Sequence, residues 1–297
     1  MITNSKIPIA YIFNKIKFEF VYVVLIGLSV KYLTLTYFDY IPEMSISIPA
    51  FIGTAISVLL SFKLNQSYDR WWEARKIWGA IVNDSRSLVL QLQAFVLDGN
   101  NQSIPEIAKR HVAWCYCLAY SLRGQSIMPE VEELLSEKEF TDLKNYQHKP
   151  MFLLKRNNDE IRSLKEKNQL NEYYHVQLNS LFVRYSDSMG MAERIKKTVF
   201  PVTYRLFLHF MIYVFVITLS ISLGEINSFF ELPLLLVISL SFFLLERTAT
   251  HMQDPFSNMP SDTNILTISR TIHINIFETL DIKPLPNPYP QNKFYSM

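Results

Sequence analysis

The chain has 297 residues, of which 49% are hydrophobic and 19% are charged, and its formal net charge is +2. This composition is too apolar for a typical soluble enzyme and too charged for a protein that lies wholly in lipid, so it favours a membrane protein with a substantial aqueous part. No dense basic tract is present, and we expect no nucleic-acid partner. Cys115 and Cys117 are too close in sequence for a disulfide framework, which favours a reducing compartment.

Four segments approach the length of about 20 mostly apolar residues that a membrane-spanning helix needs. They are Phe20–Phe38, Met44–Phe62, Leu206–Gly224 and Phe229–Leu245. The fourth is the weakest, because it is short and Glu231 lies near its start. A soluble protein with four buried core helices is the alternative, and the placement of basic residues argues against it.

In chain order, we expect five segments. Residues 1–97 hold an N-terminal helix, spans one and two and an extension of span two, and residues 98–200 form a helical cytoplasmic region. Residues 201–250 hold spans three and four, and residues 251–283 form a second cytoplasmic helical segment. Residues 284–297 are a proline-rich tail that cannot form a regular helix.

Charge placement predicts the orientation of the spans. No Lys or Arg occurs from Tyr32 to Phe62 or from Leu206 to Glu246. The two short loops between the spans carry only acidic charges, at Asp39, Glu43, Glu225 and Glu231. Because basic residues stay on the cytoplasmic side, both termini and the long middle region are predicted to be cytoplasmic, in a multi-pass protein of the cell's inner (plasma) membrane.

The sequence contains no convincing catalytic constellation. It has no Gly-rich phosphate loop, no GxSxG and no HExxH, so we expect a protein that is not an enzyme and has no cofactor. His111 and Cys115 are four residues apart with Cys117 nearby, but zinc takes three or four protein ligands. We therefore expect core packing there and no metal. His209 lies within the third span, and we favour a neutral imidazole bonded to a neighbouring helix over a functional role.

The second span carries two stripes of residues at four-residue spacing. One consists of Gly53, Ser57 and Ser61, and the other of Thr54, Val58 and Phe62. The small residues of the first stripe allow close approach of another helix. In a monomer the second stripe is a packing face. In a ring of identical subunits it would line an axial pore with successive rings of Thr, Val and Phe.

Two motifs carry a family resemblance. The stretch SYDRWWEARKIWGAI follows an apolar helix that ends in Phe62, and DPFSNMPSDTNI follows the fourth span. Together with the order of the spans, they resemble the bestrophin family, over the chain up to its tail. The signature residues are Arg70, Trp71, Trp72, Asp254, Pro255 and Phe256. The resemblance implies an all-α integral membrane protein with four transmembrane helices per subunit, assembled as a homopentamer in membrane lipid around one axial pore.

The resemblance also implies site residues. The position before the RWW motif assigns the pore neck to Thr54, Val58 and Phe62, and the cytoplasmic aperture is expected near Tyr173. Animal members carry an acidic run after the Pro-Phe pair that clasps calcium. Here most of that run is replaced and Asp262 alone is left, so the chain is similar to a prokaryotic member and needs no calcium.

Several functions follow from this reading. The resemblance implies a passive ion channel that conducts small monovalent ions, with chloride or other anions expected from animal members. A monovalent cation channel, for example for sodium, is the first alternative, because acidic outer loops concentrate cations. The second alternative is a membrane-embedded scaffold or enzyme with a helical cytoplasmic binding region.

Overall fold

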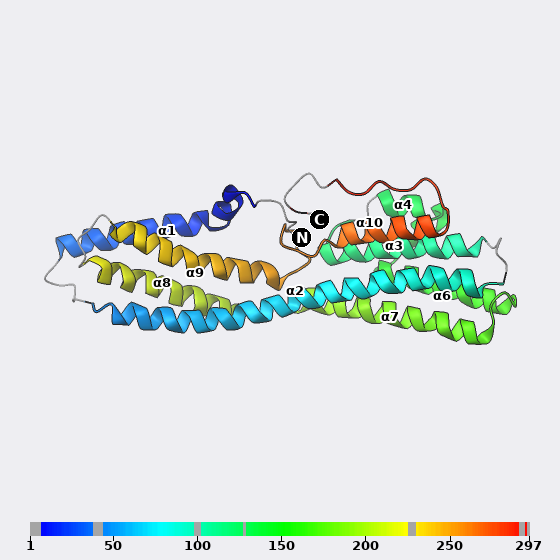
Figure 1. Cartoon of the computed structure of the whole chain (residues 1–297), viewed down its shortest axis with the longest axis horizontal. Helices are drawn as coiled ribbons and strands as arrows, with labels where there is room; N and C mark the ends of the chain where they lie inside the picture. The colour runs from blue at the N-terminus through cyan, green and yellow to red at the C-terminus, as the bar shows by residue number, and fades with distance from the viewer. Residues whose placement is uncertain are drawn as a thin grey trace. The chain divides into compact units, whose positions relative to one another are not determined.

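The computed structural model describes residues 7–37, 44–97, 102–126, 129–224, 230–290 and 295. These residues form helices and connecting segments (Figure 1). The described part contains no strand beyond isolated bridge positions such as the one between Val96 and Leu170, which confirms the predicted all-α class. The chain folds into two compact units. We call residues 7–70 and 199–253 the span unit, and residues 71–198 and those from 254 onward the extramembrane unit.

Four helices supply the span unit and are long and apolar enough to cross a membrane. They are α1 (Ile9–Thr36), α2 (Ser47–Phe95), α8 (Val202–Gly224) and α9 (Glu231–Gln253). Because α1 already begins at Ile9, the N-terminal helix and the first span are one continuous helix. Two of the predicted span ends, Phe38 and Phe229, lie outside the described residues.

Helix α2 is 49 residues long and continues from the span unit into the extramembrane unit. It contains no proline after Pro49 and only two glycines, Gly53 and Gly79, so nothing in its interior forces a break.

The span unit is apolar on its outside as well as inside. Its core is formed by side chains of all four helices, among them Val23, Ile56, Leu60, Ile212, Phe215 and Phe243. Large apolar side chains are also exposed along α1, α8 and α9, for example Leu35, Phe210 and Val237. A surface of this composition is typical of helices that contact lipid or other membrane helices.

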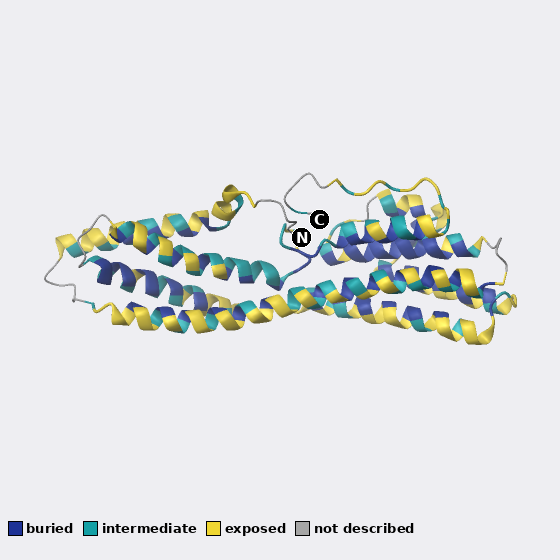
Figure 2. Ribbon diagram, viewed as in Figure 1, coloured by how far each residue is buried: buried dark blue, intermediate teal, exposed yellow. Residues whose placement is uncertain are grey.

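The extramembrane unit is built around α3 (Ser103–Arg123). This helix is buried along nearly its whole length, as its dark colour in Figure 2 shows. The helices α4 (Pro129–Leu134), α5 (Glu137–Asn145), α6 (Lys149–Glu166), α7 (Glu172–Lys197) and α10 (Ile265–Thr279) complete the unit with the second half of α2. The acidic stretch after Pro129 forms two short helices, because the Ser136 hydroxyl accepts a hydrogen bond from the amide of Glu139 and begins α5 there.

The tail after α10 is extended and is held against the extramembrane unit. The Tyr289 hydroxyl donates a hydrogen bond to Glu130 Oε1 at 3.0 Å. The guanidinium of Arg270 lies 4.5 Å from the centre of the Tyr289 ring and also contacts Glu130. Glu130 accepts a further hydrogen bond from Tyr120 at 3.1 Å. Tyr289 therefore anchors the tail on a charged cluster of α3, α4 and α10.

Candidate functional site

Within the span unit, α2 has two faces with opposite surroundings. The buried face consists of Gly53, Ile56, Leu60, Lys63 and Ser67. The opposite face is exposed in the single chain and consists of Phe51, Thr54, Val58 and Phe62. Steps of three and four residues follow the helical repeat, so each set stays on one side of α2. The three residues predicted to form a neck thus share one exposed face.

The exposed face is chemically simple. The Thr54 hydroxyl donates a hydrogen bond to the backbone carbonyl of Ala50 at 2.9 Å, so its hydrogen-bond partner lies in its own helix. Val58 and Phe62 are apolar, and 62% of the Phe62 side chain is exposed. Together with Phe51, the face therefore presents one small hydroxyl-bearing residue and three apolar ones, without any charge.

The predicted stripe of small residues does not stay on one face. Gly53 is buried, whereas Ser57 and Ser61 are exposed. The reason is that a step of four residues advances about 40° around an α-helix and Gly53 lies at the edge of the buried face, so the advance carries Ser57 and Ser61 out of that face. Thr54, Val58 and Phe62 advance by the same angle but remain within the exposed face.

Gly53 permits a close approach between α2 and α8. A Cβ atom at Gly53 would lie 3.1 Å from the ring atom Cε2 of Phe215. Further along the same interface, the Tyr204 hydroxyl donates to the carbonyl oxygen of Leu59 at 2.7 Å. These contacts hold the buried face of α2 against α8.

A buried charged cluster lies next to the end of the exposed stripe. Lys63 is fully buried, and its Nζ lies 2.6 Å from Glu246 Oε1. Lys63 Nζ also donates to the Thr250 hydroxyl at 2.9 Å, and this hydroxyl lies 2.9 Å from the same carboxylate oxygen. His209 Nε2 is 3.1 Å from the second oxygen, Glu246 Oε2. The cluster joins α2, α8 and α9 inside the span unit.

A second ion pair lies at the start of the fourth span. Lys31 Nζ is 2.9 Å from Glu231 Oε2, which joins α1 to α9. The partner of Lys31 is therefore in its own chain. The pair also explains how an apolar helix can begin with a carboxylate, because the carboxylate is neutralised by a neighbouring span.

The signature residues Arg70, Trp71 and Trp72 make structural contacts within their units. Arg70 Nε donates to the backbone carbonyl of Gln253 at 2.8 Å, which ties α2 to the end of α9 in the span unit. Trp71 Nε1 donates to the carbonyl of Ser261 at 3.1 Å in the extramembrane unit. The rings of Trp71 and Trp72 are stacked, with centroids 6.3 Å apart. The motif thus fixes the chain on either side of residue 70.

The second signature motif forms a compact turn. Asp254 Oδ2 lies 2.9 Å from Lys196 Nζ, and its Oδ1 accepts the amide of Phe256 at 3.3 Å. Burial opposes ionisation of Asp254, but bonds from Ser257 and Lys196 hold its pKa below the usual value. Phe256 is fully buried.

Asp262 is a buried carboxyl in the same turn. Its Oδ2 accepts the amide of Met259 at 3.0 Å, whereas its Oδ1 has no hydrogen-bond partner among the described residues. Burial raises the pKa of Asp262 to about 6, and the nearby charge of Asp254 contributes to this rise. The two carboxyl groups of the turn therefore have pKa values displaced in opposite directions.

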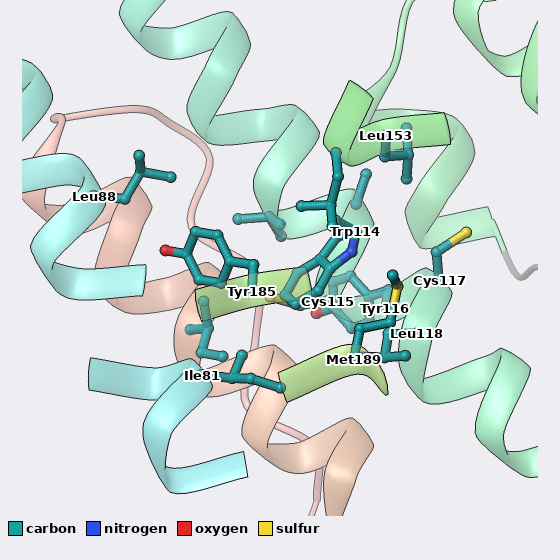
Figure 3. Packing of buried hydrophobic residues seen from close by; sticks show 14 of the residues in the cluster. Ile81, Leu88, Trp114, Cys115, Tyr116, Cys117, Leu118, Leu153, Tyr185 and Met189 are labelled. Carbon is teal, nitrogen blue, oxygen red and sulfur yellow. The ribbon is translucent and has the colours of Figure 1, made fainter. Parts of the chain in front are cut away.

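His111, Cys115 and Cys117 are buried in the extramembrane unit. Figure 3 shows the two cysteines among the hydrophobic side chains of its core. His111 Nε2 is 2.8 Å from Ser85 Oγ and 3.8 Å from Cys115 Sγ. Burial lowers the pKa of His111 to about 3 and raises that of the Cys115 thiol, so both groups are neutral. Cys117 is 200° further around α3 than Cys115 and faces elsewhere. In the described part of the chain, no three His, Cys, Asp or Glu side chains are grouped as metal ligands.

Tyr173, the residue predicted at the aperture, lies in the first turn of α7. The side chain of Asn171 caps this helix by accepting the amide of Tyr173 at 2.9 Å. The Tyr173 side chain is the most exposed of the large apolar side chains described, at 84%. Nothing in the single chain covers it.

The sequence analysis missed the cluster of Lys63, Glu246 and His209. Lys63 directly follows an apolar run, and this position is typical of a residue at the membrane surface. Instead, it occupies the packed face of α2. The available signal was the coincidence of three ionisable groups at the ends of three different spans. For His209, the favoured interpretation of a contact with a neighbouring helix is in agreement with the structure.

Comparisons with known proteins give one consistent result. A family model described as "Bacterial/Fungal Bestrophin protein" matches residues 7–278. The chain is 29% identical over 250 residues to the voltage-dependent anion channel-forming protein YneE of Escherichia coli K12, which covers 83% of this chain and 80% of that protein. It is 26% identical over 246 residues to the voltage-dependent anion channel-forming protein alr2987 of Nostoc sp., covering 82% and 79%.

A solved structure has the same fold. The crystal structure of a bacterial bestrophin homologue from Klebsiella pneumoniae has a TM-score of 0.85 with this chain at 24% identity. The match covers 91% of this chain and 100% of the other. At this level of identity the likeness shows the fold, including the order of the helices.

Proposed function

This chain belongs to the bestrophin family, and from that premise we propose that it is a passive channel for small monovalent ions in the membrane, and not an enzyme. The observation that carries the proposal is the exposed face of α2 with Thr54, Val58 and Phe62. This face is uncharged and is left uncovered by the other helices of its own unit. A helix with one packed face and one uncovered, continuous face is suited to line a pore between subunits.

The channel is a homopentamer with α2 innermost. One copy of the chain encloses no axial pore, so the exposed face requires further copies of the same chain. The family resemblance supplies the number five. Around the axis, Thr54, Val58 and Phe62 of five subunits form three successive rings, and the Phe62 ring is the main restriction because its side chains are the largest. Tyr173 forms the cytoplasmic aperture.

The permeant ion is an anion. The relatives named above as anion channel-forming proteins support this assignment. Apolar rings do not themselves select the sign of an ion, because they carry no charge. The selection therefore comes from charges at the two mouths of the pore.

A sodium-type cation channel is the second candidate. It is favoured by the outer loops, which carry acidic residues and no Lys or Arg. Of these acidic residues, Glu231 is neutralised by Lys31, and Asp39, Glu43 and Glu225 lie outside the described residues.

The protein lies in the cell's plasma membrane with both termini in the cytoplasm. The support is the distribution of Lys and Arg, which are absent from the two loops between paired spans and abundant elsewhere. A single cysteine introduced into one of the outer loops would react with a membrane-impermeant thiol reagent added to intact cells. A single cysteine introduced into the tail would not react.

One preparation tests the proposal. The detergent-solubilised protein is measured for mass and is then reconstituted in a planar bilayer with asymmetric NaCl. A pentamer whose current reverses near the chloride potential supports the anion channel, and reversal near the sodium potential identifies the cation channel. A monomer or dimer without current would contradict a channel of either sign and would favour a membrane-embedded scaffold.

A further inference from the structure

Lys63 occupies a core position of α2. The buried residues of this part of the helix follow a regular spacing of four, three and four: Ile56, Leu60, Lys63 and Ser67. An apolar residue would be expected at position 63 in this buried series. Lys63 instead places an ammonium group between α8 and α9, where it is fully buried.

The polar groups around the Lys63 ammonium group come from α9 and α8. Lys63 Nζ contacts Glu246 Oε1 at 2.6 Å and the Thr250 hydroxyl at 2.9 Å. The other carboxylate oxygen lies 3.1 Å from His209 Nε2. A further ion pair of this unit, between Glu19 and Arg247, joins α1 to α9.

A buried ion pair gives little net stability. Removing two charges from water costs several kcal/mol per ion, and well-packed apolar residues of similar volume often stabilise a core equally well or better. The pair differs from apolar packing in its geometry. An apolar side chain can slide or rotate against its neighbours, whereas an ammonium group must stay within about 3 Å of its carboxylate.

This geometry bears on the preceding residue. Phe62 and Lys63 are consecutive, so their side chains leave α2 about 100° apart. When the direction of Lys63 is fixed, the direction of Phe62 is fixed as well. A rotation of α2 that moved Phe62 would pull Lys63 away from Glu246.

We propose that Lys63 and Glu246 are positioning residues that hold α2 in one rotational setting and thereby fix where the Phe62 side chain points. The inference rests on the proposed function, because the direction of Phe62 matters for conduction only if its face lines the pore. His209 supports the arrangement by occupying the second oxygen of Glu246.

The test compares the same chemical change in two buried carboxylates of the span unit. Glu246→Gln removes the negative charge that pairs with Lys63 on α2 and leaves only a neutral acceptor, whereas Glu19→Gln does the same to the partner of Arg247 and leaves α2 untouched. The readout is the current through one open channel, which does not depend on how many channels assemble. We expect Glu246→Gln to lose the single parental current level and Glu19→Gln to retain it.

A double variant separates positioning from stability. Lys63→Met combined with Glu246→Leu removes both charges and leaves neither one unpaired, so we expect it to assemble as the parent does. It should still lack the single parental current level, because the ion pair that constrains the rotation of α2 next to Phe62 is then absent. A double variant that assembles and keeps the parental level would overturn the inference.

The remaining outcomes are also decisive. If Glu246→Gln and the double variant both fail to assemble while Glu19→Gln assembles, the pair is required for folding and the positioning role is wrong. If the parent protein carries no current, the proposed function fails first. Unchanged current levels in a conducting parent and in both variants would overturn the inference alone.

Discussion

Phe62 and Lys63 are consecutive residues of α2 with opposite surroundings: 62% of the Phe62 side chain is exposed, and Lys63 is fully buried beside Glu246. The helix therefore changes from packed to uncovered within one residue. This relationship places the largest side chain of the exposed stripe directly next to a buried ion pair of the span unit.

Truncation of Phe62 should raise conduction. Phe62→Ala removes the bulkiest ring of the proposed neck, so the layer becomes wider and easier to hydrate. We expect a larger single-channel current and an unchanged reversal potential, because no charge is altered. Thr54→Ala should have a smaller effect, since one small side chain replaces another.

Phe210 on α8 provides the matched control, because its exposed fraction is also 62%. Phe210→Ala should leave the single-channel current unchanged. An equal increase in both variants would mean that truncation loosens the assembly in general. Loss of assembly in Phe62→Ala would identify Phe62 as a packing residue, for which truncation costs about 3–5 kcal/mol.

The two glycines of α2 should respond oppositely to alanine. Gly53→Ala places a methyl group 3.1 Å from Phe215, whose ring is held by Phe242 at a centroid distance of 5.1 Å. We expect a lower melting temperature, since overpacking costs about 1–3 kcal/mol. Gly79→Ala has no atom within 4 Å of the new methyl group. It should raise stability by up to about 1 kcal/mol, because alanine is the better helix former. The reverse order in thermal unfolding would contradict this packing.

Conduction should not require calcium. A calcium ion takes six to eight oxygen ligands, largely from carboxylates. In the turn after α9, Asp254 is paired with Lys196, and one oxygen of Asp262 is bonded to the amide of Met259. Bilayer currents should be equal in chelator and in micromolar free calcium. A steep and reversible increase with calcium would show that ligands from another part of the chain or another subunit complete a site.

Asp262 should destabilise the extramembrane unit at neutral pH. Its pKa is raised to about 6 in the folded state, so the protonated form is favoured there. The unfolded chain ionises near pH 4 and the folded chain only near pH 6, so stability falls as pH rises through this window. Asp262→Asn keeps an acceptor for Met259 and removes the buried charge. We expect its stability at pH 7 to be higher by about 1 kcal/mol and the fall between pH 4 and 6 to be smaller.

Asp254→Asn is the control, and it should change stability at pH 7 in the opposite direction to Asp262→Asn. The pKa of Asp254 is lowered, so its ionised form contributes stability above the unfolded pKa, and this contribution is lost as the pH falls. The variant should be less stable than the parent at pH 7. Unfolding followed by intrinsic fluorescence between pH 4 and 7 separates the two carboxyl groups, and equal pH profiles for parent and Asp262→Asn would contradict the assignment.

Much of the fold could be predicted from the sequence because the relevant signals are local. Mostly apolar runs of sufficient length indicate the spans, and the lack of a breaker after Pro49 favours a long second helix. The division of the acidic stretch at Ser136 could not be read from periodicity alone, because a single capping hydroxyl decides it.

The candidate site on α2 could be predicted only in part, because only its local features leave a signal in the sequence. The stripe of Thr54, Val58 and Phe62 is a property of one helix, and its residues do share an exposed face. Lys63 and Glu246 are 183 positions apart, and neither the period of α2 nor that of α9 indicates that they meet. Their pairing depends on how the spans pack, which is a long-range property.

The anchored tail has a consequence for anything that binds the extramembrane unit. Tyr289 is tethered to the same chain as its partners Glu130 and Arg270, so its effective concentration at that cluster is on the order of millimolar. A soluble aromatic or basic peptide that recognises the cluster must displace an intramolecular competitor. Its apparent affinity is therefore weakened by the occupancy of the tail, and any event that releases Tyr289 makes the surface available.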